Sequence, residues 1–369
     1  MKLYLISVGF LLGGALAHDH DANSQRTILY TPSVAIPFEP LNVTSTDQSQ
    51  IFNGIYYLSD HNNAGVQVAD LVTGKHVTVI GGFAGNQPVH SASGPNGMVV
   101  LANRNELYAG DAGGIVRVID LLTNTIVANI SLNAATRADE MAYDPETQTV
   151  IVTVPEITPP KVSIINAKTR TVIGEIFIPE ATMGLEQPTF HSTSNTFYVS
   201  IPQATDLLGG GVAQLDVSRL VVTRFIPIPS CIPAGMAFGP GNNMFIACTN
   251  TQIQLFGVGF SLVIDVSSGR VLSTIPGLWG IDQVAYNPTA QLYYAAANNR
   301  LTGDTTLSGK PNPALGVVDA ITNTLVQLIP TDNITAHSCA VDTVTNQLVV
   351  PLAHEGIQVY NLTTTPGAN

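Results

Sequence analysis

Polar and titratable residues recur at one position of a repeated sequence pattern, directly before a short apolar segment. They are Asn96, Asp139-Glu140, Glu186-Gln187, Asp282-Gln283 and His337-Ser338. Carboxylates and an imidazole at equivalent positions can transfer protons, and oxygen-bearing side chains can bind a divalent cation or polarise a carbonyl. These residues are the first candidates for a functional site.

A second set of polar residues follows the next strand-like segment of each repeat. It comprises Asp60-His61-Asn62, Asp111, Glu156, Asn250, Asn298-Asn299 and His354-Glu355. Taken singly, each could cap a strand end or bind channel water. We expect the two sets to converge on one pocket, because only 11% of the chain is charged and a concave site with a few convergent polar groups is the usual form of a small-molecule site.

The pattern that carries the first set reads RADEMAYDPETQTVIV at residues 137–152. It recurs as IDQVAYNPTAQLYYAA from residue 281 and AHSCAVDTVTNQLVVPL from residue 336, with looser copies from residues 95, 185 and 234. Self-similarity at a period of about 40–50 residues, with several β-rich segments in each copy, is typical of a β-propeller. The sequence therefore predicts an all-β protein built as one β-propeller.

We expect seven blades, with six as the alternative because the first unit, at about residues 41–80, lacks a clear polar anchor. The last unit has only three strand-like segments, and residues 27–38 provide an unpaired one. Adding this N-terminal strand to the last unit would close the ring and remove an exposed sheet edge. The predicted propeller domain spans residues 26–369.

Residues 1–17 are typical of a secretory signal peptide, with Lys2, an apolar core at 3–12 and a small-x-small motif at 15–17. The polar residues 18–25 are expected to be a flexible start of the mature chain. Together these features predict a protein of the secretory pathway that is secreted.

No later stretch is apolar enough to span a bilayer. A formal net charge of −12 without a Lys/Arg cluster argues against a nucleic-acid partner.

Sequons and cysteines agree with that route. Predicted glycosylation sites are Asn42, Asn129, Asn333 and Asn361. Antiparallel strand pairing would bring Cys231 and Cys248 close enough for a disulfide, with two free thiols as the alternative. Cys339 lies on an inner strand and is expected to be a buried free thiol.

Three chemistries suit the predicted ring of polar residues. Glu140, Glu186 and Asp282, with Asn96, could hold Ca²⁺ through oxygen ligands. His337 or His354 could perform acid–base catalysis against a neighbouring carboxylate. Alternatively, the pocket could hold two reactive partners in register while hydrogen-bond donors polarise one of them.

Aromatic residues could provide the apolar walls of such a pocket, although each could equally be part of the core. They are Phe83, Phe256, Phe260 and Trp279. The sequence contains no G-x-S-x-G, H-E-x-x-H or P-loop motif. Serine hydrolase, zincin and NTPase functions therefore have no support from motifs.

The chain resembles the fungal β-propeller hetero-Diels–Alderases of tropolone–sesquiterpene meroterpenoid biosynthesis, and more broadly the secreted lactonase-like and surface-layer-like propellers. The resemblance rests on IFNGIYYLSDHNNAGVQVADL (51–71), SGPNGMVVL (93–101), RADEMAYDP (137–145), LEQPTF (185–190) and AHSCAVD (336–342). It implies an intermolecular cycloaddition between a humulene-type alkene and an ortho-quinone methide derived from a tropolone or phenol. The product is a dihydropyran.

The resemblance also implies a division of roles without a cofactor. We expect His337, Glu186 and Asp282 to be catalytic, through protonation or hydrogen bonding. The expected substrate-binding residues are His61, Asn96, Glu140, Gln187, Trp279, Gln283 and His354. The expected partners are the apolar terpene and the quinone methide.

Two other functions remain alternatives. A lactonase-like, metal-dependent hydrolase would place Ca²⁺ in the channel, but the fifth anchor is Gly235-Met236 and Asp282 is followed by Gln283, which departs from that pattern. A secreted propeller that binds a ligand without turnover is the third possibility.

Overall fold

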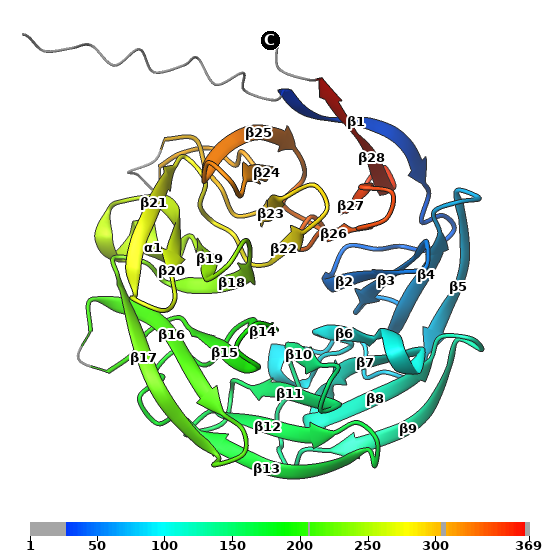
Figure 1. The fold of residues 1–369 in the computed structure, drawn as a ribbon. Helices are drawn as coiled ribbons and strands as arrows, with labels where there is room; N and C mark the ends of the chain where they lie inside the picture. Colours follow the sequence, from blue (N-terminus) through cyan, green and yellow to red (C-terminus); the bar gives the residue numbers. More distant parts are fainter. Residues whose placement is uncertain (1–26, 206, 304–307, 366–369) are drawn as a thin grey trace, which may run out of the picture.

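The computed structural model describes residues 27–205, 207–303 and 308–365. The predicted signal peptide (1–17) and flexible N-terminus (18–25) lie outside these ranges. The described residues form seven four-stranded antiparallel sheets arranged as blades around a central axis (Figure 1). The prediction of a seven-bladed, all-β propeller is therefore confirmed, and the six-bladed alternative was wrong.

The first four blades follow the chain directly. Blade 1 contains β2 (Thr46–Phe52), β3 (Ile55–Asp60), β4 (Gly65–Asp70) and β5 (Lys75–Gly81). Blade 2 contains β6 (Met98–Leu101), β7 (Glu106–Asp111), β8 (Ile115–Asp120) and β9 (Thr125–Ser131). Blade 3 contains β10 (Met141–Asp144), β11 (Thr149–Val154), β12 (Lys161–Asn166) and β13 (Thr171–Phe177). Blade 4 contains β14 (Pro188–His191), β15 (Thr196–Ile201), β16 (Gly209–Asp216) and β17 (Val221–Pro229).

The remaining three blades complete the ring. Blade 5 contains β18 (Pro233–Phe238), β19 (Asn243–Cys248), β20 (Phe260–Asp265) and β21 (Arg270–Pro276), with the short helix α1 (Thr251–Phe256). Blade 6 contains β22 (Val284–Asn287), β23 (Leu292–Ala297), β24 (Ala314–Asp319) and β25 (Thr324–Pro330). Blade 7 contains β26 (Ala340–Val341), β27 (Leu348–Leu352), β28 (Gly356–Thr365) and β1 (Thr27–Ile36). Three 3₁₀ turns occur at His90–Ala92, Ala102–Arg104 and Ala112–Gly114.

In most blades, one aspartate forms the turn between the third and fourth strands. Asp70 Oδ1 accepts hydrogen bonds from the amides of Val72 and Thr73, at 2.8 and 3.0 Å. Asp120, Asp216, Asp265 and Asp319 accept equivalent bonds. Such Asx turns satisfy backbone donors that no strand can pair. An aspartate at the end of the third strand therefore produces the same tight link to the fourth strand in these five blades.

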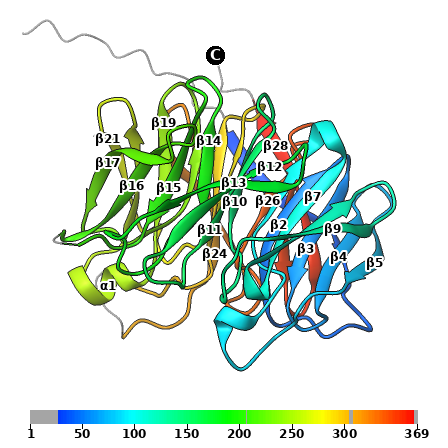
Figure 2. The same cartoon turned by 90° about the horizontal axis from the view of Figure 1, so that it is seen from below.

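The core lies between neighbouring blades, because sheet faces stack against each other around the axis (Figure 2). Middle strands such as β7 and β11 are buried along their whole length, whereas outer strands such as β5 alternate between buried and exposed positions. Between blades 1 and 2, for example, Tyr57 and Val66 pack with Met98 and Leu107. Burying each such side chain contributes about 1.5–3 kcal/mol.

The ring closes as the sequence predicts. β1 pairs antiparallel with β28, so the seventh sheet has the order β1-β28-β27-β26. The Tyr30 hydroxyl also lies 2.7 Å from the Tyr294 hydroxyl of blade 6, and the backbone of Tyr30 exchanges two hydrogen bonds with the Gln327 amide. The N-terminal strand thus joins blade 7 and contacts blade 6.

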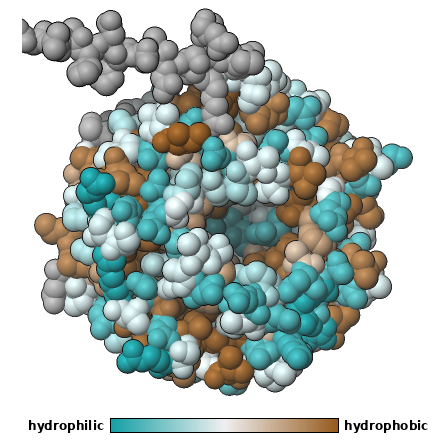
Figure 3. All heavy atoms as spheres, in the orientation of Figure 1, coloured by the Kyte–Doolittle hydropathy of each residue, from teal (hydrophilic) through white to brown (hydrophobic). Residues whose placement is uncertain are grey.

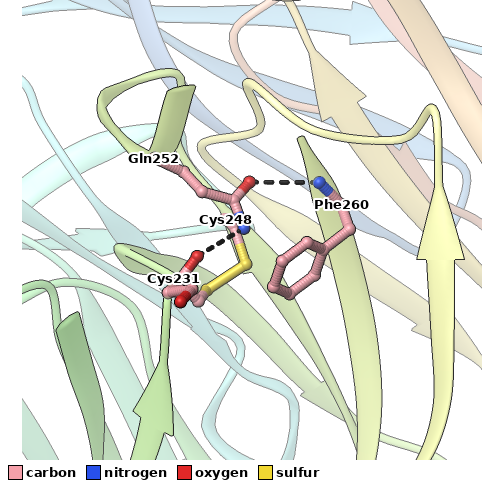
Figure 4. Close-up of a disulfide and its surroundings, with 5 residues drawn as sticks. Cys231, Cys248, Gln252 and Phe260 are labelled. Atoms are coloured by element: carbon pink, nitrogen blue, oxygen red, sulfur yellow. Dashed lines mark hydrogen bonds between the residues drawn. A yellow bond between two sulfur atoms is a disulfide. The ribbon is translucent and has the colours of Figure 1, made fainter. Parts of the chain in front are cut away.

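The predicted disulfide joins Cys231 to Cys248 in blade 5, with Cα atoms 5.3 Å apart (Figure 4). It links the entry to β18 with the end of β19. Gln252 of α1 secures the same region, because its Nε2 donates to the Ser230 carbonyl and its Oε1 accepts from the Phe260 amide. Cys339 is buried and unpaired, as expected, and burial raises the pKa of its thiol to about 12.

The side chains of Asn42, Asn129, Asn333 and Asn361 are all exposed, which glycosylation requires, and the modification itself stays a prediction. Among the described residues, no helix has the length and apolar character that crossing a membrane would demand.

Candidate functional site

A polar cavity of about 410 Å³ lies at one mouth of the central channel. Hydrophilic side chains line the hollow at the centre of the ring in Figure 3. The titratable residues that line this cavity are Asp47, His61, His90, Arg137, Asp139, Glu140, Glu186, Asp282 and His337. Blades far apart in sequence thus contribute charged groups to one small volume.

One repeated backbone hydrogen bond positions the acidic residues that precede the inner strands. The amide of Asp139 donates to the Thr153 carbonyl at 3.0 Å, and the amide of Glu186 donates to the Ser200 carbonyl at the same distance. Asp282 makes the equivalent bond to Ala296 at 3.4 Å. In blades 3, 4 and 6 the residue two positions before the inner strand is therefore tied to the second strand, and its side chain lines the cavity.

His337 and Asp282 form an ion pair in the cavity, with Nε2 and Oδ2 2.9 Å apart. Burial alone would lower the pKa of His337, but the charge and hydrogen bond of Asp282 outweigh it and raise this pKa to about 9. Conversely, burial opposes ionisation of Asp282, and the His337 cation holds the pKa of that carboxyl below its usual range. Near pH 7 the pair is an imidazolium and a carboxylate.

The second ring nitrogen of His337 has no hydrogen-bond partner. Its Nδ1 is buried and accepts or donates no hydrogen bond. The carboxylate oxygen Oδ1 of Asp47 lies 4.0 Å away, which is too far for a hydrogen bond. Because an imidazolium carries a proton on both nitrogens, Nδ1–H is a charged donor that is buried beside the cavity without an acceptor.

Neighbouring carboxyl groups are driven toward their neutral form. Burial, followed by the charges of Glu186 and Asp139, raises the pKa of Glu140 well above its usual range. Burial and the charge of Asp282 do the same for Glu186. The Glu140 side chain is only 4% exposed and its Oε2 has no partner. Burial also raises the pKa of Asp139 to about 7.

Arg137 is the main cation among these carboxylates. Its guanidinium lies 2.9 Å from Asp139, 3.4 Å from Glu156 and 3.8 Å from Asp47. Although burial opposes its charge, these carboxylates raise the pKa of Arg137, so it stays protonated. Arg137 therefore neutralises part of the negative charge of the cavity, in addition to His337.

Sequence reasoning missed Asp47, His90 and Arg137. Asp47-Gln48 repeats the acid–glutamine dipeptide of Glu186-Gln187 and Asp282-Gln283, so that dipeptide was the signal that would have supplied the missing anchor of the first blade. Arg137 stands inside the RADEMAYDP pattern. His90 does not belong to the repeated sequence pattern, so only the fold shows that it lines the cavity.

The glutamines of these dipeptides serve a second role. Gln187 Oε1 accepts hydrogen bonds from the amides of Met236 and Val284, at 3.1 and 3.2 Å. Gln283 Nε2 donates to Asp47 Oδ1 at 3.1 Å. Both glutamines line a second cavity deeper in the channel, so they bridge blades beneath the charged ring rather than lining the polar cavity at the mouth.

Other predicted residues are placed differently. His61 lines the polar cavity, its Nδ1 lies 3.1 Å from the Ser45 hydroxyl, and burial lowers its pKa. Asn96 is fully buried and donates to two backbone carbonyls, those of Ser93 and Ala138.

Asn96, Gln187 and Gln283 do not line the polar cavity, and neither do two further predicted substrate-binding residues. Trp279 is completely buried within blade 5 and 6 packing, and His354 is exposed in the turn between β27 and β28. The three phenylalanines proposed as walls, Phe83, Phe256 and Phe260, are also absent from the lining.

The Ca²⁺ alternative finds no preformed ligand set. Among the described residues, no three or more His, Cys, Asp or Glu side chains are grouped so that they could hold a metal ion. His337 and Arg137 already neutralise carboxylates of the ring. The residues present do not fit a bound Ca²⁺ ion in this arrangement.

Comparison with known proteins supports the fold. No protein-family model matches the chain, and no curated protein does. A chain of hydrazine synthase from Kuenenia stuttgartiensis is similar in structure, with a TM-score of 0.69 over 90% of this chain and 98% of that one. Because the two sequences are only 12% identical, the likeness shows the β-propeller fold alone.

Proposed function

We propose that the protein is a cyclase that catalyses an intermolecular hetero-Diels–Alder reaction between a humulene-type alkene and a tropolone- or phenol-derived ortho-quinone methide. The observation that carries this proposal is the His337–Asp282 ion pair, which lines the cavity beside carboxyl groups that favour their neutral form. Such a site donates protons and hydrogen bonds to an oxygen-bearing substrate.

Formation of the quinone methide would use a proton donor. A hydroxymethyl precursor must lose water, and a neutral carboxylic acid can protonate the leaving hydroxyl. Glu186 and Glu140 line the cavity and have raised pKa values, so they are the proposed acids. The ring hydroxyl of the precursor loses its proton as its oxygen becomes the carbonyl of the quinone methide, so the net product besides the quinone methide is one water.

The cycloaddition itself needs positioning and electrostatic stabilisation rather than a bond to the enzyme. One C–C and one C–O bond form while three π bonds become one, so no electrons are gained or lost. Negative charge develops on the quinone-methide oxygen as the alkene adds, and the imidazolium of His337, which lines the cavity, is the proposed positive charge that stabilises that oxygen. Asp282 keeps the imidazolium charged and oriented.

The decisive experiment is a turnover assay of the purified protein with a humulene-type alkene and a hydroxymethyl tropolone or phenol, with and without EDTA. We expect cycloadduct faster than in buffer, enriched in one stereoisomer and insensitive to EDTA. His337→Asn should lower kcat about a hundredfold, and Glu186→Gln should lower it when the hydroxymethyl precursor is used but much less with a preformed quinone methide.

The matched control is His76→Asn, because His76 lies on the outer strand β5 and bonds to Gln67, outside the cavity. This variant should retain wild-type turnover. EDTA-sensitive cleavage of lactones without cycloaddition would contradict the proposal and favour the metal-dependent hydrolase.

A further inference from the structure

The second cavity, deeper in the channel, has a volume of about 240 Å³ and is called the lower cavity below. Gln48 and Gln283, which line it, directly follow Asp47 and Asp282 of the polar cavity in sequence. It follows the inner strands β2, β22 and β26 away from these residues and reaches Thr343, which comes after the end of β26. The two cavities have no lining residue in common, so the channel contains two separate compartments.

The lower cavity is uncharged, in contrast to the polar cavity. None of the described residues that line it is Asp, Glu, Lys, Arg or His. Its titratable side chains are Tyr286 and Cys339, and burial raises the pKa of both, to about 12 for Cys339, so both are neutral at physiological pH. A charged ligand would lose its hydration here without meeting an opposite charge. The lower cavity therefore suits an uncharged ligand.

Three side-chain amides of the lower cavity can form further hydrogen bonds. Gln48 Oε1 accepts from the Met98 amide, Gln50 Nε2 donates to the Met98 carbonyl, and Gln283 Nε2 donates to Asp47. The other ends of these amides, Gln48 Nε2, Gln50 Oε1 and Gln283 Oε1, have no partner among the described residues, and none is a buried orphan atom. Gln48 and Gln283 are only 5% and 3% exposed and line this cavity, so a ligand in it can reach them.

Apolar groups complete the lining of the lower cavity. Ile51, Tyr286 and Val341 line it and are half-buried, whereas Thr343 at its outer end is exposed. A ring with hydroxyl groups around its edge and C–H groups on its faces can bond to the amides and pack against these side chains at the same time. The volume corresponds to roughly eight water molecules, which is the size of a single sugar ring.

We propose that the lower cavity is a binding site for one uncharged sugar ring, which enters past Thr343. Each hydroxyl of a sugar can both donate and accept, so it matches the Gln48 donor and the Gln50 and Gln283 acceptors. The ring occupies a compartment that no step of the proposed cycloaddition uses. The inference is therefore independent of the proposed function, and either can fail without the other.

Ligand-observed NMR tests this site without any turnover. Saturation transfer from the purified protein to methyl glucoside, methyl galactoside and methyl mannoside at millimolar concentration detects weak binding, and titration gives the Kd. We expect at least one of these sugars to bind. The corresponding uronate adds a carboxylate and cyclohexanol retains a single hydroxyl, so both should bind about tenfold more weakly or worse. Failure of all three sugars to bind, or equal binding of the uronate and cyclohexanol, would overturn the proposal.

Two variants of one exposed turn locate the site. Thr343 lines the lower cavity, whereas Val344, the next residue, is 86% exposed and is not part of the lining. Thr343→Trp should weaken sugar binding about tenfold or more, because the indole fills part of the entrance. Val344→Trp is the matched control and should bind like the wild type. Equal sugar affinities of the two variants would place the sugar elsewhere and refute the proposal.

Gln50→Met tests recognition by the amides. The substitution keeps the length of the side chain and removes the Oε1 acceptor, together with the 3.2 Å bond to the Met98 carbonyl. We expect sugar affinity to fall about fivefold, with thermal unfolding as the check that the variant is folded. A folded Gln50→Met protein with wild-type sugar affinity would contradict the proposal. Should this variant fail to fold, the Thr343→Trp and Val344→Trp pair decides the question.

Discussion

At the scale of single residues, the His337–Asp282 pair couples stability to pH. The pKa of His337 is raised from its ordinary value of 6.5 to about 9. A histidine with a raised folded-state pKa stabilises the fold fully below its unfolded pKa, and this contribution is lost as pH rises through the folded pKa. The window for His337 is therefore pH 6.5 to about 9.

We expect the unfolding free energy of the wild type to fall by about 2 kcal/mol across that window, after allowance for solvent screening. His337→Asn removes the titrating group, so its stability should change less between pH 6.5 and 9. Denaturant titrations at several pH values measure the difference. Parallel pH profiles for the two proteins would show that His337 does not contribute in this way.

The cavity also shows which single residues a sequence can reveal. His337, Glu186, Asp282 and Glu140 were predictable because each directly precedes a recurring apolar strand. Arg137 was not predictable, because an arginine in a sequence is usually interpreted as a solvated surface charge. Only the fold shows that Asp47, Asp139 and Glu156 lie around it. Which charged residues form ion pairs depends on the distances between blades, and the repeated sequence pattern does not specify these distances.

At the scale of elements, the Cys231–Cys248 disulfide joins the entry of β18 to the end of β19 across 17 residues of sequence. Closing a loop of this size constrains the unfolded chain and is worth about 3 kcal/mol. The double variant Cys231→Ala/Cys248→Ala should lose stability of that order. Cys339→Ala is the control, because Cys339 is unpaired.

Thermal or denaturant unfolding monitored by Trp279 fluorescence would measure this loss. A double variant as stable as Cys339→Ala would mean that β18–β19 pairing and α1 hold the blade without the bridge.

Strands and turns were the most predictable elements. The repeat placed the inner strands correctly because hydrophobic segments recur in its copies, and an aspartate turn links the third and fourth strands of five blades. The first blade was harder to anchor, because Asp47 lies inside β2 (Thr46–Phe52) rather than before it. α1 was not predicted, since six residues after a strand carry too little helical pattern.

At the scale of the whole molecule, β1 closes the ring through its pairing with β28. A chain that begins at Pro37 would lose this strand, the Tyr30–Tyr294 contact and the Gln327 bonds. We expect it to be several kcal/mol less stable and to aggregate, because β28 would become an unpaired sheet edge. Unfolding curves and light scattering measure both effects.

Adding a synthetic peptide of residues 27–36 in trans is the matched rescue. It should restore part of the stability, because it can pair with the open edge of β28. A truncated chain with wild-type stability and no aggregation would show that the closing strand is dispensable.

The arrangement of β1 and β28 has a consequence for biosynthesis. Ile28 pairs with Thr364, so the first described strand must wait until nearly all of the chain has been made. At 5–20 residues per second, this delay is roughly 20–70 s. During that time the other six blades can assemble from contiguous sequence, whereas the seventh cannot. The Ile28 and Tyr30 side chains become buried only when the ring closes. We therefore expect chaperones to bind the unpaired β1 segment while the rest of the chain is being made.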